Sequence, residues 1–377
     1  MTSTNAQKLF ELGQSVWYDN IERRLLNNGE LEAMINRGDI YGVTSNPTIF
    51  NNAIGKSQDY DGQLRELVTQ GLRTSEIFDE FTFSDIRSAC DLFRPLYDTT
   101  RGGDGYVSIE VHPDLANDTD ATNEEVQRLW AKVDRPNLMV KIPGTAAGIP
   151  AIRHSISTGV NINITLIFAR SRYAEVIEAY MAGLERRVES NLPIAHQASV
   201  ASFFVSRIDT KVDQWLDDIV KQGGAKGVKA ASLKGRIAIA NAKLAYQLFK
   251  AQFSTLRFEA LKKKGARLQR PLWASTSTKN PAYPDLLYVD SLIGKGTVNT
   301  MPHETLGAFK DHGMVEETIE NHLDTSQQAL ADLEELGLSL DMATAELEVE
   351  GVESFSKSIH AVFDTIEQRS QSPVAEE

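Results

Sequence analysis

Short runs of β-forming residues alternate with longer helical stretches along most of this chain, and this alternation constrains the fold more than any other feature. The expected strands are residues 15–20, 41–47, 106–111, 138–143, 160–168, 198–207, 270–278 and 297–302. Helical periodicity fills the intervals, as at residues 123–133, 171–188 and 235–253. Strands that alternate with helices form parallel sheets, and eight of them close most naturally into a barrel. The sequence therefore predicts an α/β fold, a (β/α)8 TIM barrel.

The chain of 377 residues is longer than the roughly 250 residues of a bare barrel. We expect a single domain over residues 1–377, with the barrel core at about 15–302, helical insertions at 48–105 and 208–269, a helical C-terminal region at 303–368 and a disordered tail at 369–377. Residues 286–294 compete for the place of the eighth strand, and we assign them to the loop region before residues 297–302.

Composition excludes several classes of function. The formal net charge of −13 leaves no uniform basic surface for nucleic acid. The single cysteine, Cys90, excludes an intrachain disulfide and a CxxC metal site, and it fits a reducing compartment. The first residues lack the features of a signal peptide, and no apolar run approaches the ~20 residues of a membrane span. We expect a cytoplasmic protein that binds neither membranes nor nucleic acid.

A lysine interrupts the apolar strand at residues 138–143, and side-chain alternation indicates where it points. Lys141 shares one face of this strand with Met139 and Pro143, whereas Val140 and Ile142 occupy the other. A lone lysine within a strand is more often an edge residue than a nucleophile. In a barrel covered by helices, however, the apolar face must be the outer one, so Lys141 is predicted to face the interior.

Other expected strands show the same division between a polar and an apolar face. Asn161, Asn163 and Thr165 share one face of their strand, and Glu110 lies with Ser108 on the polar face of another. Asp19 and Asn46 end two further strands; barrel enzymes place catalytic groups at such carboxyl ends. These polar faces need a common aqueous interior, which the mouth of a barrel provides.

The residue types on these faces favour amine catalysis. Zinc would require His or Cys ligands, which these strand positions do not offer, and a lysine among carboxylates would compete with a magnesium ion. A neutral lysine can attack a carbonyl group and form a Schiff base. Its ordinary pKa is about 10.4; burial lowers the pKa of a lysine and neighbouring carboxylates raise it.

Cationic and hydroxyl side chains follow two of the later strands. Arg207 comes directly after one strand, and residues 275–279 ("STSTK") end another and contribute Ser275 and Lys279. Arginine, lysine and hydroxyl groups suit a phosphate ligand. An ordinary Ser/Thr-rich turn before a proline explains "STSTK" equally well.

Several motifs together resemble those of the transaldolases. These are "GVTSNPTIF" (42–50), "VSIEVHPDL" (107–115), "LMVKIPGTAAG" (138–148), "INITLIF" (162–168) and "ASFFVSRID" (201–209). The resemblance extends from about residue 15 to about residue 302, and the long C-terminal region resembles that of the larger bacterial subfamily. It implies a class I barrel enzyme without metal or cofactor. Such an enzyme moves a dihydroxyacetone unit between sugar phosphates in the non-oxidative pentose phosphate pathway.

The resemblance also implies roles for individual residues. By motif, Lys141 would form the Schiff base, and Asp19 would take the proton of the C4 hydroxyl. Glu110 and Thr165 would hold a water for the dehydration step, and Asn46 and Asn163 would form hydrogen bonds with the dihydroxyacetone unit. Arg207 and Ser275 would bind the phosphate, with Ser202 nearby. Many family members carry a second arginine soon after the serine of the seventh strand. Here Lys279 stands near that place, at a different spacing.

Three other functions stay open from the sequence. A class I aldolase would release free dihydroxyacetone. A glycoside hydrolase would use Asp19 and Glu110 as a carboxylate pair and leave Lys141 without a task. A sugar-phosphate-binding protein would need only the anion ligands. The sequence does not indicate an oligomeric state.

Overall fold

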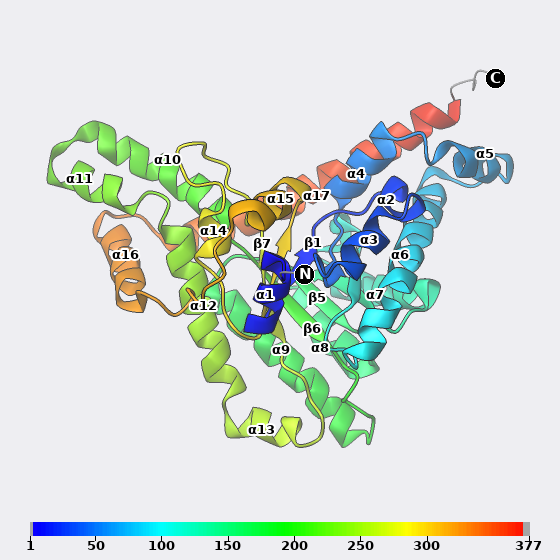
Figure 1. The fold of residues 1–377 in the computed structure, drawn as a ribbon, viewed down its shortest axis with the longest axis horizontal. Helices are drawn as coiled ribbons and strands as arrows, with labels where there is room; N and C mark the ends of the chain where they lie inside the picture. Colours follow the sequence, from blue (N-terminus) through cyan, green and yellow to red (C-terminus); the bar gives the residue numbers. More distant parts are fainter. Residues whose placement is uncertain (1–2, 372–377) are drawn as a thin grey trace.

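Eight parallel strands close into a barrel in chain order in the computed structural model, which describes residues 3–371 (Figure 1). The strands are β1 (Gln14–Tyr18), β2 (Gly42–Val43), β3 (Tyr106–Glu110), β4 (Leu138–Pro143), β5 (Ile162–Ile167), β6 (Ser199–Phe204), β7 (Arg270–Ala274) and β8 (Thr297–Met301). The predicted TIM barrel is confirmed, and each observed strand overlaps its expected range. Residues 287–290 form a short helix, so 297–302 supplies the eighth strand as predicted.

Helices surround the barrel and form the insertions. They are α1 (Asn5–Leu12), α2 (Arg23–Asn27), α3 (Glu30–Asn36), α4 (Pro47–Lys56), α5 (Asp61–Thr69), α6 (Thr74–Thr99), the 3-10 helix η1 (Pro113–Leu115), α7 (Thr119–Val133), α8 (Gly148–Thr158), α9 (Arg170–Glu189), α10 (Ser206–Gln222), α11 (Gly224–Leu233), α12 (Ile237–Phe253), α13 (Leu256–Lys262), α14 (Leu287–Asp290), α15 (His303–His312), α16 (Leu323–Glu335) and α17 (Leu340–Gln371). The three helical intervals expected from periodicity correspond to α7, α9 and α12. None of the helices between residues 3 and 371 combines the length and apolar character that crossing a membrane requires.

Side-chain alternation along the strands places the polar groups inside. All six residues of β4 are buried, and so are all six of β5. Register pairs Lys141 of β4 with Glu110 of β3 on one side and with Asn163 of β5 on the other. Val140 pairs with Ile162 on the opposite face, where the surrounding helices cover the sheet. Three polar side chains of neighbouring strands therefore lie at one level of the barrel interior.

Seven of the eight strands end earlier than the sequence predicts, and the ends of β7 and β6 determine where two predicted site residues lie. The expected strand at 270–278 stops at Ala274. The next residue, Ser275, has a left-handed backbone conformation (φ +55°), which is incompatible with an extended strand. The expected strand at 198–207 stops at Phe204, because helix α10 begins at Ser206. Arg207 therefore lies in the first turn of a helix.

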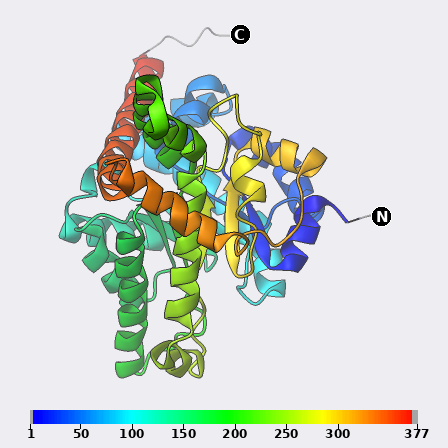
Figure 2. The same ribbon diagram turned by 90° about the vertical axis from the view of Figure 1, so that its left-hand side faces the viewer.

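The insertions extend the molecule away from the barrel. Helices α10 and α11 pair and contact α16 through α11 on one flank (Figure 1). Figure 2 shows α9 and α12 as long helices side by side, and α13, which follows α12 in the chain, contacts both. The extra length beyond a bare barrel lies in α4–α6, in the segment from α10 to α13 and in α15–α17.

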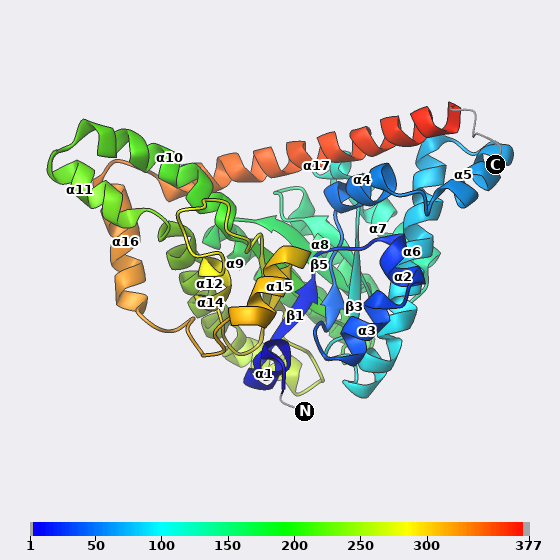
Figure 3. The ribbon, with the colours of Figure 1, turned by 45° about the horizontal axis from the view of Figure 1, so that its top comes forward.

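The last helix crosses the carboxyl end of the barrel. Figure 3 shows α17 running over the top of the molecule, and it contacts α4, α10 and β5. It includes residues 369–371, which the sequence assigned to the disordered tail, because the Arg369 guanidinium donates hydrogen bonds to the carbonyl oxygens of Ile54 and Ser57 and to the Asp61 carboxylate. The rest of that predicted tail, 372–377, lies outside the described residues.

Candidate active site

The amine of Lys141 lies inside the barrel, between two neighbouring strands. Its Nζ is 2.9 Å from Oε2 of Glu110 and donates a hydrogen bond of 2.9 Å to the carbonyl oxygen of Ser45. The side chains of Lys141 and Glu110 are only 6% and 3% exposed. Ser45 follows β2, and its hydroxyl donates to the carbonyl oxygen of Ser108 in β3, which fixes this corner of the interior.

The carboxyl group of Glu110 has an electrostatic environment that suits proton transfer. Burial raises its pKa above the ordinary value, and the Lys141 amine opposes this shift. Its Oε1 atom has no hydrogen-bond partner among residues 3–371, and neither has the buried hydroxyl of Thr165. Glu110 therefore retains an acceptor position after it has paired with Lys141.

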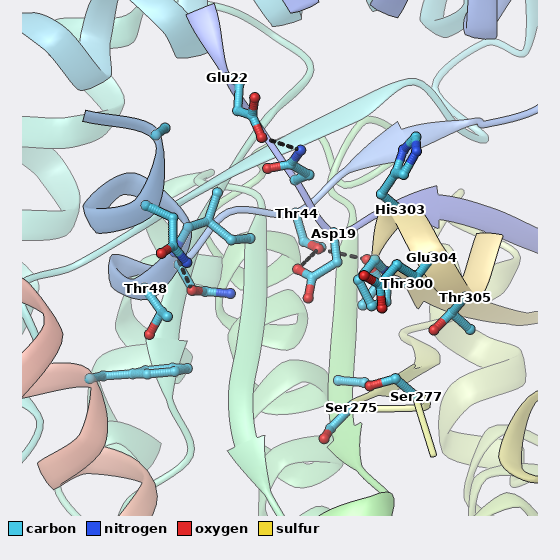
Figure 4. A pocket seen from close by; sticks show the side chains of 18 of the residues that line it. Asp19, Glu22, Thr44, Thr48, Ser275, Ser277, Thr300, His303, Glu304 and Thr305 are labelled. Carbon is cyan, nitrogen blue, oxygen red and sulfur yellow. Dashed lines mark hydrogen bonds between the residues drawn. The ribbon is translucent and has the colours of Figure 1, made fainter. Parts of the chain in front are cut away.

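Asp19 lies at the end of β1, where hydroxyl groups hold its carboxylate (Figure 4). Its backbone N–H continues the ladder to the carbonyl oxygen of Met301, and its Oδ1 accepts a hydrogen bond of 2.6 Å from the Thr44 hydroxyl. Thr44 is itself 2.6 Å from the Thr300 hydroxyl. Burial raises the pKa of Asp19, whereas the Thr44 hydrogen bond and the charge of Lys141 lower it.

A cavity of about 1140 Å³ opens at the carboxyl end of the barrel. Eight of the ten residues predicted for the site line it: Lys141, Asp19, Thr165, Asn46, Ser202, Arg207, Ser275 and Lys279. Glu110 and Asn163 do not line this cavity. They pair in register with Lys141 on its two sides, at the same level of the barrel, and they contact the lysine or its neighbours rather than the open space.

Asn163 joins three strands through its amide. Its Nδ2 donates to the Ser108 hydroxyl at 3.0 Å, and its Oδ1 accepts from the Ser202 hydroxyl at 2.7 Å. Asn46 is differently placed, since its Oδ1 caps α4 by accepting from the backbone N–H of Ile49, and its amide group borders the cavity. The predicted role of both asparagines in holding substrate hydroxyls stays a prediction.

The predicted anion ligands gather on the side of β6 and β7. Arg207 lies in the first turn of α10 with its guanidinium 5.5 Å from the centre of the Phe204 ring, and burial lowers its pKa. Ser275 contacts Ser206 of the same turn at 3.0 Å between hydroxyl oxygens. The exposed Lys279 donates a hydrogen bond of 2.7 Å to Ser277, on the same wall of the cavity.

The structure adds residues to the site that the sequence did not indicate. Thr44 holds Asp19, the backbone of Ser45 holds Lys141, and Phe204 and Phe355 line the cavity. Thr44, Ser45 and Phe204 lie within the quoted motifs, so inspection of every motif position could have found them. Phe355 lies in α17, where one sequence offers no signal for which face of the helix covers the barrel.

Among the residues between 3 and 371, no group of three or more His, Cys, Asp or Glu side chains has the arrangement of a metal site. A second cavity, of about 280 Å³, shares Asn46 with the first one. Glu110, His112 and Arg128 are among its lining residues, and α6, α7 and α17 contribute about half of its wall.

Comparison with known proteins identifies relatives of the whole chain. The model of the family described as "Transaldolase/Fructose-6-phosphate aldolase" matches residues 16–366. A transaldolase of Parafrankia sp. (strain EAN1pec) is 48% identical over 95% of this chain and 95% of its own length. A transaldolase of Acidothermus cellulolyticus is 48% identical over 93% of both chains, and one of Trichodesmium erythraeum is 42% identical over 98% of both.

Proposed function

The chain belongs to the transaldolase/fructose-6-phosphate aldolase family, and from this premise we propose that it is a transaldolase that works through a Schiff base on Lys141. The donor is a ketose phosphate, fructose 6-phosphate or sedoheptulose 7-phosphate. The acceptor is an aldose phosphate, glyceraldehyde 3-phosphate or erythrose 4-phosphate. One observation carries the proposal. A buried amine borders the cavity that Asp19 also lines, with Glu110 2.9 Å from its nitrogen.

The first step joins the donor to the enzyme. The neutral Lys141 amine attacks the C2 carbonyl of the ketose and forms a carbinolamine. Loss of the C2 hydroxyl as water requires a proton, and Glu110 supplies it, since burial raises the pKa of this carboxyl group. The unpartnered Thr165 hydroxyl and Glu110 Oε1 offer polar partners for a water that carries the proton. The product is an iminium ion on Lys141.

The second step breaks the bond between C3 and C4. Asp19 takes the proton of the C4 hydroxyl, and the electrons of the C3–C4 bond move into the iminium ion. An aldose phosphate leaves, and an enamine of dihydroxyacetone stays on Lys141. The raised pKa of Asp19 suits this role, because a more basic carboxylate accepts the proton more readily.

The third step transfers the unit. C3 of the enamine attacks the aldehyde carbon of the acceptor, and Asp19 returns its proton to the new C4 oxygen. Hydrolysis of the resulting iminium ion, by the reverse of the first step, releases the new ketose phosphate and the free lysine.

The wall formed by β6, β7 and α10 supports phosphate binding. Arg207 supplies a planar donor, Lys279 a point charge and Ser275 a hydroxyl, and the first turn of α10 supplies the positive end of a helix dipole. Sugar phosphates are therefore the proposed substrates, and the proposed location is the cytoplasm.

The experiment that tests this function separates a transaldolase from an aldolase. Fructose 6-phosphate is incubated with the enzyme with and without erythrose 4-phosphate, and sedoheptulose 7-phosphate, glyceraldehyde 3-phosphate and free dihydroxyacetone are quantified. We expect sustained turnover only with the acceptor, with sedoheptulose 7-phosphate as the product. Equal turnover without the acceptor, with release of dihydroxyacetone, would instead establish an aldolase.

A further inference from the structure

An aromatic ring of the last helix lies over the catalytic lysine. Nζ of Lys141 is 6.0 Å from the centre of the Phe355 ring. Phe355 is 4% exposed, and it lines the same cavity as Lys141, Thr165 and Ser202. The amine thus has polar neighbours inside the barrel and an apolar neighbour on the side of α17.

Close packing one turn earlier in α17 fixes the position of this ring. A Cβ atom on Gly351 would lie 2.8 Å from Cδ2 of Leu166, so the helix backbone approaches the end of β5 closely. Leu166 has φ +58° and lies where the register between β5 and β6 shifts, directly after Thr165. The irregular end of β5 therefore turns a side chain toward α17.

Polar contacts hold the helix on both sides of Phe355. Lys211 of α10 is 2.5 Å from Glu346 and 2.7 Å from Glu350. On the other side, Asp114 accepts a hydrogen bond from the Ser356 hydroxyl, and its Oδ2 is 2.9 Å from Nε2 of His360. Phe355 is therefore part of a fixed wall.

The position of this wall is relevant to the lifetime of the enamine on Lys141. In a transfer reaction the enamine must wait for the acceptor. If it instead takes a proton at C3, the resulting iminium ion can add water at C2, and expulsion of the lysine amine then releases free dihydroxyacetone. The proton taken up at C3 is balanced by one released when water adds and the neutral amine leaves, so the side reaction consumes one water overall; one function of a closed active site is to prevent it.

We propose that Phe355 determines the partition between transfer and hydrolysis by excluding water from the Lys141 adduct on the side of α17. The proposal rests on the Schiff-base function proposed above. The ring face also attracts a cation within about 6 Å, so it favours the iminium ion electrostatically. Phe355 acts on the environment of the lysine and takes no part in proton transfer.

The test compares variants at this position by one ratio. The ratio is free dihydroxyacetone released to sedoheptulose 7-phosphate formed, measured with fructose 6-phosphate and saturating erythrose 4-phosphate. We expect Phe355→Ala to raise it about tenfold, which corresponds to about 1.4 kcal/mol in relative barrier height. Phe355→Leu restores apolar volume without an aromatic face, and we expect its ratio to stay within about twofold of the unmodified enzyme if water exclusion is the cause.

A second aromatic residue of α17 provides the matched control. Phe363 packs on Phe78 and His112 and lies outside the cavity of Lys141. Phe363→Ala should therefore leave the ratio unchanged even though it removes a similar ring from the same helix. An unchanged ratio in Phe355→Ala, or an equal rise in both alanine variants, would overturn the proposal.

Borohydride trapping with fructose 6-phosphate separates this failure from failure of the proposed function. An adduct on Lys141 in every variant, with an unchanged ratio, rejects only the role of Phe355. No adduct in the unmodified enzyme rejects the Schiff base itself.

Discussion

The barrel interior contains two buried acid–base clusters, one at each end, and they differ in how completely their hydrogen bonds are made. At the amino end, Asp104 accepts from the Trp17 indole at 2.7 Å, from the Ser15 hydroxyl and from Arg270 at 3.2 Å. At the carboxyl end, Glu110 pairs with Lys141 through Oε2, and its Oε1 has no hydrogen-bond partner within the described part of the chain.

This difference indicates which cluster does chemistry. The Asp104 cluster is saturated, and close packing surrounds it: a Cβ atom on Gly42 would lie 2.6 Å from the Trp17 ring. The Lys141 cluster combines unpartnered polar atoms with a cavity of about 1140 Å³ and with two carboxyl groups of raised pKa. A buried ion pair alone is therefore weak evidence for catalysis, whereas an unsaturated one beside a cavity is a good candidate.

Removal of the lysine should have the largest effect. We expect Lys141→Ala to lower transfer activity by at least about 10⁴-fold, because the variant lacks the amine on which the covalent adduct is proposed to form. Formation of sedoheptulose 7-phosphate measures the loss, and circular dichroism checks the fold. Activity within tenfold of the unmodified enzyme would mean that the unsaturated cluster is not the catalytic one.

Asp19 tests whether binding and cleavage can be separated within that cluster. Asp19→Asn keeps the size of the side chain and removes the base, so we expect cleavage to slow by about 10²- to 10⁴-fold. Adduct formation on Lys141 should persist, because Asp19 acts after the Schiff base has formed. Mass spectrometry after reduction and the rate of aldose release measure the two steps; loss of the adduct with normal cleavage would contradict the assigned role.

The saturated cluster should affect stability instead of chemistry. Asp104→Asn leaves the Arg270 charge without its partner, and we expect the free energy of unfolding to fall by about 3 kcal/mol. Urea denaturation measures this loss. The kcat and KM of the folded variant should change less than about twofold, and a selective fall in kcat would remove the distinction between the two ends.

Asp209, another buried carboxyl group, shows that a raised pKa alone does not make a catalytic residue. Burial raises the pKa of Asp209 to about 7, although the Ala238 N–H at 2.7 Å and the Tyr288 hydroxyl at 3.0 Å both donate to it. The folded state therefore binds a proton more tightly than the unfolded state, so stability should fall as pH rises from about 4 to about 7.

Asp209→Asn should flatten this pH dependence. The part of the free energy of unfolding that this carboxyl group makes dependent on pH is a few kcal/mol at most. Urea denaturation at several pH values measures it, and kcat at pH 7 serves as the comparison. An unchanged slope of stability against pH would show that another group causes the dependence.

The sequence predicted the parts of this molecule that depend on local alternation. Side-chain alternation along β3, β4 and β5 placed Glu110, Lys141 and Asn163 on one interior face. The register of these strands brings the three side chains to one level. The bulge at Leu166 was not predicted, because nothing in an apolar strand marks where its register shifts.

Contacts between segments far apart in the chain could not be predicted from the sequence, for a related reason. Phe355 lies far along the chain from Lys141, and the helical pattern of its region fits several ways of packing on the barrel. The extent of α17 was likewise set by partners elsewhere, since Arg369 binds one backbone carbonyl in the last turn of α4 and another directly after this helix. Long-range packing decides these features, and a single sequence encodes it only through the sum of many weak preferences.

Borohydride reduction tests whether Lys141 forms the covalent intermediate. The full-length enzyme is reduced in the presence of fructose 6-phosphate, digested and mapped by mass spectrometry. We expect a mass increase on the peptide that contains Lys141, and none without the sugar phosphate. An active enzyme whose Lys141 peptide stays unmodified, or whose adduct lies on a different lysine, would contradict it.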